Sequence, residues 1–114
     1  MKGEHMAHYI LTGSYTAAAA KGMIANPSDR EAAARAIIEA GGGKLTSFLL
    51  TTGETDFNMI VQTDDINNLL AGLLVVAASG AVSNLKTVQA FTSAEFTAAQ
   101  KAAATIMAKY QPPT

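Results

Sequence analysis

The sequence contains no cysteine. This absence rules out disulfide bridges, thiolate metal sites and a cysteine nucleophile together, and it favours a reducing compartment, so we expect a cytoplasmic protein. Basic runs are missing as well, because eight Lys and Arg residues are scattered among nine Asp and Glu residues, for a net charge of −1. A chain with this balance has no field to attract a nucleic acid or an anionic membrane, and we expect neither as a partner.

Charge itself is scarce. Only 15% of the residues are charged, against about 25% in a typical domain, while 49% are hydrophobic. A monomer needs a polar coat, so this composition predicts that a second copy of the chain covers part of the surface. Long apolar runs are also missing: the most apolar run, residues 69–78, contains Gly72 and is about half of the ~20 residues that a membrane-spanning helix needs. We expect that run to be a core helix.

The chain has 114 residues, which suits one domain. The first five residues are not followed by the apolar stretch that a signal peptide requires. Met6 resembles a second start, so we expect residues 1–5 to be a cloning remnant. Residues 6–111 then form a single domain, and residues 112–114, with Pro112 and Pro113, form a short tail.

Hydrophobic periodicity predicts strands over residues 8–15, 44–52, 56–63 and 81–91, and helices over residues 16–24, 28–40, 64–79 and 92–110. Residues 53–55 are expected to be the loop of a short hairpin. Three helix starts carry capping signals, which are Ser28 with Glu31, Asp64 with Asp65, and Thr92 with Glu95. In the helix over residues 64–79, Val75 and Val76 extend the apolar face, which predicts burial on more than one side.

This order of elements predicts an α+β fold of the ferredoxin-like split βαβ type, with an antiparallel four-stranded sheet and helices on one face. Alternate residues of a strand point to opposite faces, so apolar strand residues such as Phe48, Leu50 and Ile60 cannot all meet the helices. We expect the uncovered face to pack on a second copy, which makes a dimeric α+β barrel.

Several segments in this order resemble the GYD-domain family of small bacterial proteins. They are Tyr9-Ile10-Leu11-Thr12-Gly13, residues 31–40 running into Gly42-Gly43-Lys44-Leu45, Ser47-Phe48, the Gly53-x-x-Asp56 turn, residues 88–91 and Glu95-Phe96. The resemblance covers most of residues 6–109. It implies a dimeric α+β barrel similar to cofactor-free monooxygenases, muconolactone isomerases and chlorite dismutases, but no particular activity. Thr55 stands where the family's Gly-Tyr-Asp signature has its tyrosine, so any role of that ring is absent or supplied elsewhere.

Asp56 is the best candidate for a catalytic residue, as a general base where the hairpin loop meets the next strand. The simpler interpretation, which we favour, is that its carboxylate accepts backbone N–H bonds in the turn. The candidate ligand-binding residues are Asp56, Asn58, Phe48, Leu50 and Tyr15.

Strand alternation predicts that Asp56, Asn58 and Gln62 line the barrel, while Phe57, Met59 and Val61 meet the helices. With a loop of three residues, Phe48 and Leu50 lie opposite Ile60 and Asn58, and a loop of two or four reverses this pairing. Such a wall would either hold a small apolar molecule through a few polar anchors or form a filled dimer seam.

His8 is expected to be a surface or interface residue rather than a proton shuttle. The glycines at positions 41–43 follow a helix and precede a strand, which indicates a helix end and no nucleotide site. We expect no metal and no cofactor. Three hypotheses remain: a homo-oligomer that binds a small apolar molecule, a cofactor-independent monooxygenase or isomerase, and a purely structural or regulatory oligomer.

Overall fold

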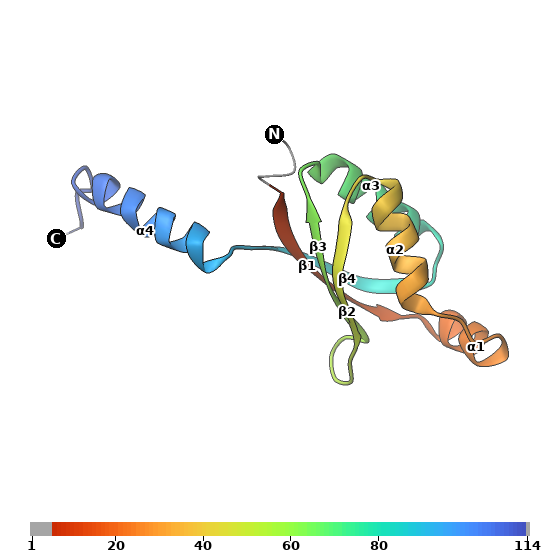
Figure 1. The fold of residues 1–114 in the computed structure, drawn as a ribbon. Helices are drawn as coiled ribbons and strands as arrows, with labels where there is room; N and C mark the ends of the chain where they lie inside the picture. Colours follow the sequence, from red (N-terminus) through yellow and green to blue (C-terminus); the bar gives the residue numbers. More distant parts are fainter. Residues whose placement is uncertain (1–5, 114) are drawn as a thin grey trace.

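The computed structural model describes residues 6–113, so the expected cloning remnant at residues 1–5 lies outside the described residues. Figure 1 shows the elements in chain order. They are β1 (Ala7–Tyr15), α1 (Ala17–Ala25), α2 (Arg30–Ala40), β2 (Lys44–Leu50), β3 (Phe57–Thr63), α3 (Ile66–Ala78), β4 (Val82–Ala90) and α4 (Ser93–Met107).

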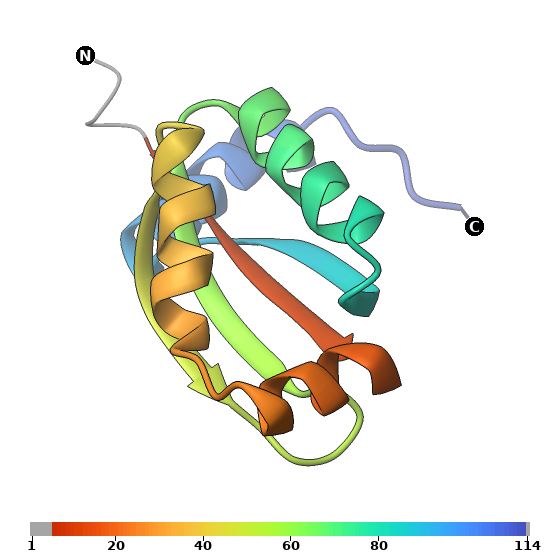
Figure 2. The ribbon, with the colours of Figure 1, turned by 90° about the vertical axis from the view of Figure 1, so that its right-hand side faces the viewer.

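The four strands form one sheet in the order β2-β3-β1-β4, and each neighbouring pair is antiparallel. α2 and α3 lie side by side over one face of this sheet (Figure 2). This is the ferredoxin-like α+β arrangement, and the predicted fold class is confirmed. Within the described part of the chain, no helix covers the opposite face in the sheet region (Figure 1).

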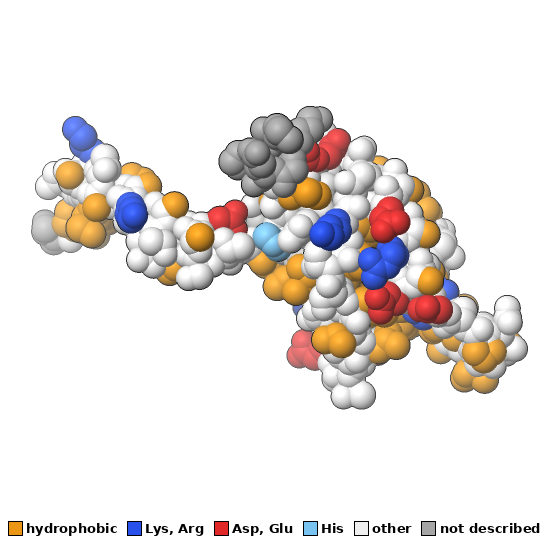
Figure 3. Space-filling view, viewed as in Figure 1, with side chains coloured by type: hydrophobic (Ala, Val, Ile, Leu, Met, Phe, Trp, Pro, Cys, Tyr) orange, Lys and Arg blue, Asp and Glu red, His pale blue; other side chains and the backbone are white. Residues whose placement is uncertain are grey.

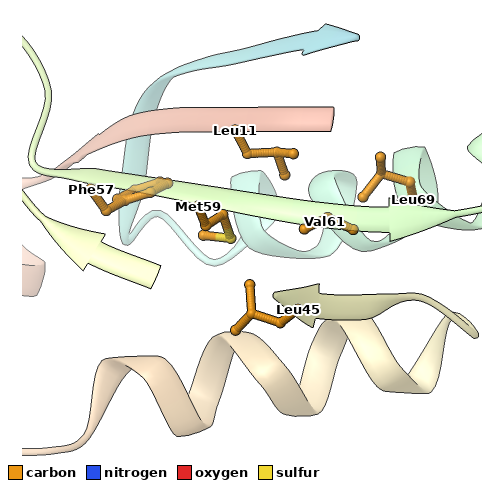
Figure 4. Packing of buried hydrophobic residues seen from close by; sticks show 6 residues of the cluster. All are labelled: Leu11, Leu45, Phe57, Met59, Val61 and Leu69. Carbon is orange, nitrogen blue, oxygen red and sulfur yellow. The ribbon is translucent and has the colours of Figure 1, made fainter. Parts of the chain in front are cut away.

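The core lies between the sheet and α2 and α3. Burial alternates strictly along β3, because every second side chain points toward the helices. Phe57, Met59 and Val61 are buried, as predicted, and so is Thr63; Val61 has no exposed surface. Leu11, Leu45 and Leu69 complete the buried cluster from β1, β2 and α3 (Figure 4).

Two of the three predicted helix starts are confirmed. The Asp65 carboxylate accepts the Asn68 N–H at the start of α3, and Thr92 and Glu95 form a complete capping box at the start of α4. The prediction for α2 was wrong by one residue. Asp29, not Ser28, is the N-cap, and its carboxylate accepts the Ala32 N–H at 3.1 Å.

The hairpin between β2 and β3 has a longer connection than predicted. It spans residues 51–56, and it is closed by a hydrogen bond of 2.8 Å from the Thr51 N–H to the Asp56 carbonyl. With this connection Phe48 pairs with Met59 and Leu50 pairs with Phe57, which is the reverse of the pairing for a three-residue loop. Phe48 therefore packs against the core on the helix side.

The prediction that α3 is buried on more than one side was wrong. Leu69 is buried and Leu73 packs against the core, but Leu74 and Val75 are 70% and 62% exposed. The helix lies on the outer layer, so only one stripe of its surface meets the sheet. Its remaining apolar surface faces outward.

α4 does not return to the domain. It projects from the end of β4 on the side of the sheet opposite to α2 and α3, as the two ribbon views agree (Figures 1 and 2). All of its residues are exposed, and the helix ends at Met107, short of the predicted Tyr110. The radius of gyration is 18.0 Å, where a compact domain of about this length has about 13 Å.

Candidate functional site

Asp56 connects the hairpin loop to the end of β1. Its backbone N–H donates to the Gly13 carbonyl at 2.7 Å, and its Oδ2 accepts the Tyr15 N–H at 2.8 Å. Tyr15 is the last residue of β1 and lies beyond the final β1–β3 pair of Gly13 with Phe57, so its N–H on that side needs another acceptor. The carboxylate supplies that acceptor. The geometry gives Asp56 a structural role, and its role as a general base stays a prediction.

Tyr15 turns from this anchor toward the helix side of the sheet. Its ring lies 5.5 Å from the ring of Phe57 at an angle of 47°, a tilted aromatic pair of the favourable kind. One side of Tyr15 thereby joins the core. The residue also lines a surface cleft, so it is the one predicted ligand contact that the structure places beside a cavity of useful size.

This cleft, called here the Arg30 cleft, lies between α1, the start of α2, the end of β1 and the start of β4. Its volume is about 370 Å³, within the range of roughly 300–1,000 Å³ usual for small-molecule sites. Apolar and polar groups share its walls, which are formed by Tyr15, Ala19, Gly22, Met23, Asn26, Ser28, Arg30 and Ala81.

Arg30 is the charged group of the cleft. Its Nη1 donates to the Ser28 hydroxyl at 3.1 Å. Its Nε is shielded from solvent and has no hydrogen-bond partner among residues 6–113. A shielded N–H of a cation without an acceptor is costly, because the group has given up water and gained nothing in return. A rotation of the Arg30 side chain that brought Nε to an acceptor of a ligand would remove that cost.

The uncovered face of the sheet has a separate organisation, which follows from the strand register. Its central cross-strand row is mostly apolar and consists of Val88, Ile10, Ile60 and Ser47. The two flanking rows are mostly polar, and they consist of Lys86, Thr12, Asn58 and Leu49 on one side and of Ala90, His8, Gln62 and Lys44 on the other. We call these three rows the open face.

His8 and Gln62 contact each other on the open face. The Nε2 atoms of the two side chains are 2.8 Å apart. Which of the two nitrogens donates depends on the tautomer of the His8 ring. The Nδ1 atom is shielded and has no partner among the described residues.

Glu95 adds an electrostatic link between α4 and β1. The backbone N–H of Thr92 lowers the pKa of this carboxyl below its ordinary value. Desolvation partly opposes this effect, and the Thr92 hydroxyl and the charge of His8 reinforce it to a smaller extent. Glu95 completes the capping box, in which its Oε1 accepts the Thr92 N–H at 2.7 Å. The start of α4 is thus held in place by an ionised carboxylate beside β1.

The five predicted ligand contacts do not form one site. Asp56 and Tyr15 are joined at the end of β1, while Asn58 lies on the open face. Phe48 and Leu50 pair with helix-side residues of β3, so they share no wall with Asn58. Sequence reasoning missed Arg30, since an arginine in the first turn of a helix has no pattern that separates it from a solvated charge.

A second cavity lies inside the core, between the sheet and α2 and α3. Its volume is about 50 Å³, and its lining is apolar and includes Leu11, Met59 and Leu73. This is far below the size of a small-molecule site. Between residues 6 and 113, no three His, Asp or Glu side chains are grouped so that they could hold a metal ion. No helix of that span has the length and apolar character to cross a bilayer.

The sheet order and the two covering helices define a ferredoxin-like α+β domain. Within that class, the family model described as the GYD domain matches residues 9–100, and the chain belongs to the GYD-domain family. The match runs from β1 into α4, so it includes Tyr15, Arg30 and Asp56. No curated protein matches the sequence significantly.

Proposed function

We propose that this chain is a small-molecule-binding protein that works as a homodimer, and that its ligand is a small carboxylate with a largely apolar body held in the Arg30 cleft. The observation that carries the proposal is the shielded, unpartnered Nε of Arg30 in the wall of a cleft of about 370 Å³. The site differs from the sheet-lined cavity predicted from the sequence, although Tyr15 belongs to both.

The chemistry of the cleft supports a carboxylate. A guanidinium presents its donors in a planar fork that matches the two oxygens of a carboxylate, and such charge-assisted pairs are among the stronger hydrogen bonds in proteins. Ser28 accepts one hydrogen of Nη1, and a rotation of the side chain that exposes Nε would present Nε and Nη2 as the fork. Tyr15, Ala19 and Met23 offer apolar surface to the rest of the ligand.

Benzoate and its neutral analogue benzamide test this proposal, since they share a ring and differ in charge. We expect benzoate to shift the backbone amide signals of Gly22 and Ala81 in a saturable NMR titration, and to bind about tenfold more tightly than benzamide. Arg30→Gln should weaken benzoate binding about tenfold. Lys21→Gln removes the same charge from an exposed position on α1 and should leave it unchanged. Equal binding of the two probes, or no effect of Arg30→Gln, contradicts the proposal.

The open face supports self-association. An apolar central row with polar rows on both sides resembles the core and rim of a protein interface. Ile10 and Ile60 lie opposite each other in that central row, and Val88, next to Ile10, is 58% exposed. Two copies packed through this face would form the eight-stranded arrangement of a dimeric α+β barrel.

Sedimentation at micromolar concentration tests the dimer. We expect a mass of two subunits for the unaltered chain. Ile60→Lys places a charge in the centre of the open face and should give a single subunit, because a buried unpaired charge costs several kcal/mol. Ile24→Lys is the control, since Ile24 is 81% exposed on α1, remote from the open face, and the dimer should persist. A single subunit for the unaltered chain would remove the dimer from the proposal.

A further inference from the structure

α4 carries an apolar stripe that no other segment of residues 6–113 covers. Phe96, Ile106 and Met107 lie at helical spacing with Ala99 and Ala103, and they are 63%, 67% and 72% exposed. Tyr110, just past the helix end, continues the stripe at 64% exposed. We call these residues the arm stripe. Figure 3 shows hydrophobic side chains along α4, well away from the body of the domain. A projecting helix with such a stripe needs a partner surface.

The start of α4 is held so that the helix points away. Thr92 is extended, at φ −72° and ψ 164°, and the capping box with Glu95 satisfies the N–H groups of Thr92 and Glu95. Only Phe91 and Thr92 connect β4 to the helix. The connection is short, and the two hydrogen bonds of the capping box join its last residue, Thr92, to Glu95 in the first turn. The direction of α4 is therefore set locally. The surface that receives the arm stripe therefore lies on another molecule.

The chain itself offers a matching surface on α3. The segment Ile66–Ala78 contains no charged residue, and its exposed side is apolar apart from Asn67 and Asn68. Ile66, Leu70, Leu74 and Val75 are 40%, 48%, 70% and 62% exposed. We call these four residues the α3 patch. The arm stripe cannot reach the α3 patch of its own chain, because α3 and α4 lie on opposite sides of the sheet (Figures 1 and 2).

The length of α4 fits a crossing to a second copy. Its fifteen residues span about 22 Å. Two sheets packed face to face lie about 10 Å apart, and the helix layer of the second copy lies about 10 Å further out. α4 points to the side on which the second copy would sit, so it ends beside that copy's helix layer. In each copy, α3 is the helix that contacts β4. For α4 of one copy to reach α3 of the other, the β4 edges of the two sheets must therefore lie on the same side of the dimer.

The buried area is also sufficient. With about 200 Å² for each large side chain, the four large residues of the arm stripe expose roughly 500 Å² of apolar surface. A two-fold exchange uses this surface twice, together with a comparable area of each α3 patch. The total is about 2,000 Å², at the upper end of the range for stable interfaces.

We propose that α4 is an exchanged arm: in the homodimer proposed above, on which this inference rests, the arm stripe of each copy packs against the α3 patch of the other copy. The exchange explains why both apolar surfaces are exposed in a single chain. It also explains the low charge content of the sequence, because neither surface meets water in the dimer.

Photocrosslinking of the full chain tests the arm. Met107 is replaced by p-benzoylphenylalanine in one variant, and Thr105, on the opposite side of α4, is replaced in a control variant. We expect the label at position 107 to give a covalent dimer on a denaturing gel, joined to a peptide within residues 66–78. The label at position 105 should give at least fivefold less of this product. Circular dichroism checks that both variants are folded.

The outcomes separate the two proposals. A sedimenting dimer with no crosslink from position 107 to residues 66–78 overturns the arm and keeps the open-face dimer. A crosslink within one chain, or equal yields from positions 107 and 105, also overturns the arm. A single subunit for the unaltered chain overturns both. As a second measurement, Ile106→Asp should weaken dimerisation at least tenfold, and Thr105→Asp should change it less than twofold.

Discussion

The hydrogen bond between the Asp56 carboxylate and the Tyr15 N–H supports a quantitative prediction. Hydrogen bonds to charged groups contribute about 1.5–3 kcal/mol when a shielded partner would otherwise be left unsatisfied. The Tyr15 N–H is partly buried and lies 2.8 Å from Oδ2. We therefore expect Asp56→Ala to lower the free energy of unfolding by about 2 kcal/mol. Asp56→Asn keeps an oxygen acceptor without the charge, and about 1 kcal/mol should be lost.

Urea unfolding at one fixed protein concentration measures these effects, since the stability of a dimer depends on concentration. With a slope of about 1.5 kcal/mol per M, the midpoint should fall by roughly 1.3 M for Asp56→Ala. Asp64→Ala is the matched control, because Asp64 is an exposed carboxylate just before the N-cap of α3. If Asp56→Ala shifts the midpoint no more than Asp64→Ala, the anchoring role is wrong. If Asp56→Asn abolished a measured turnover without this loss of stability, the result would instead support the hypothesis that Asp56 is a general base.

Two further predictions concern the glycines and the start of α4. Gly13→Ala should destabilise the fold by about 1–3 kcal/mol, because the new Cβ would lie 2.6 Å from the Phe57 ring. The Cβ of Gly22→Ala in α1 meets nothing within 4 Å, so this change should stabilise the fold by roughly 0.5–1 kcal/mol. These two predictions are contradicted if the urea midpoints of the two variants move in the same direction. The Glu95 pKa is lowered, so its capping contribution is complete above the ordinary pKa of 4.5 and is lost as pH falls through the folded value. An NMR titration should place the Glu95 pKa below 4.5, and the first turn of α4 should fray only below that pH. A pKa at or above 4.5 refutes the role of the capping box.

Local patterns were sufficient to predict the elements and their order. Alternation placed Phe57, Met59 and Val61 toward the helices, and short-range side-chain bonds at Asp65 and Thr92 marked two helix starts correctly. These features depend on neighbours within a few residues, so they can be derived from the sequence alone. The order of the elements then restricts the topology to few solutions, of which the ferredoxin-like fold is one.

Contacts between distant segments decided the rest. The register of β2 depends on the length of the loop over residues 51–56 and on which side chains fill the core, and it moved Phe48 to the helix side. Arg30 became a candidate only when α1 and the end of β1 formed a cleft around it. Asp56 and Tyr15 are separated by 41 positions in the sequence, and only the folded sheet brings them together.

The stripe on α4 shows the same division. Its 3.6-residue periodicity predicts an amphipathic helix from the sequence alone, but periodicity does not say which surface the apolar side will cover. The tertiary structure decides this, because the short connection after β4 directs the helix away from its own sheet. Local propensity therefore determined what each segment is, and long-range packing determined what each segment meets.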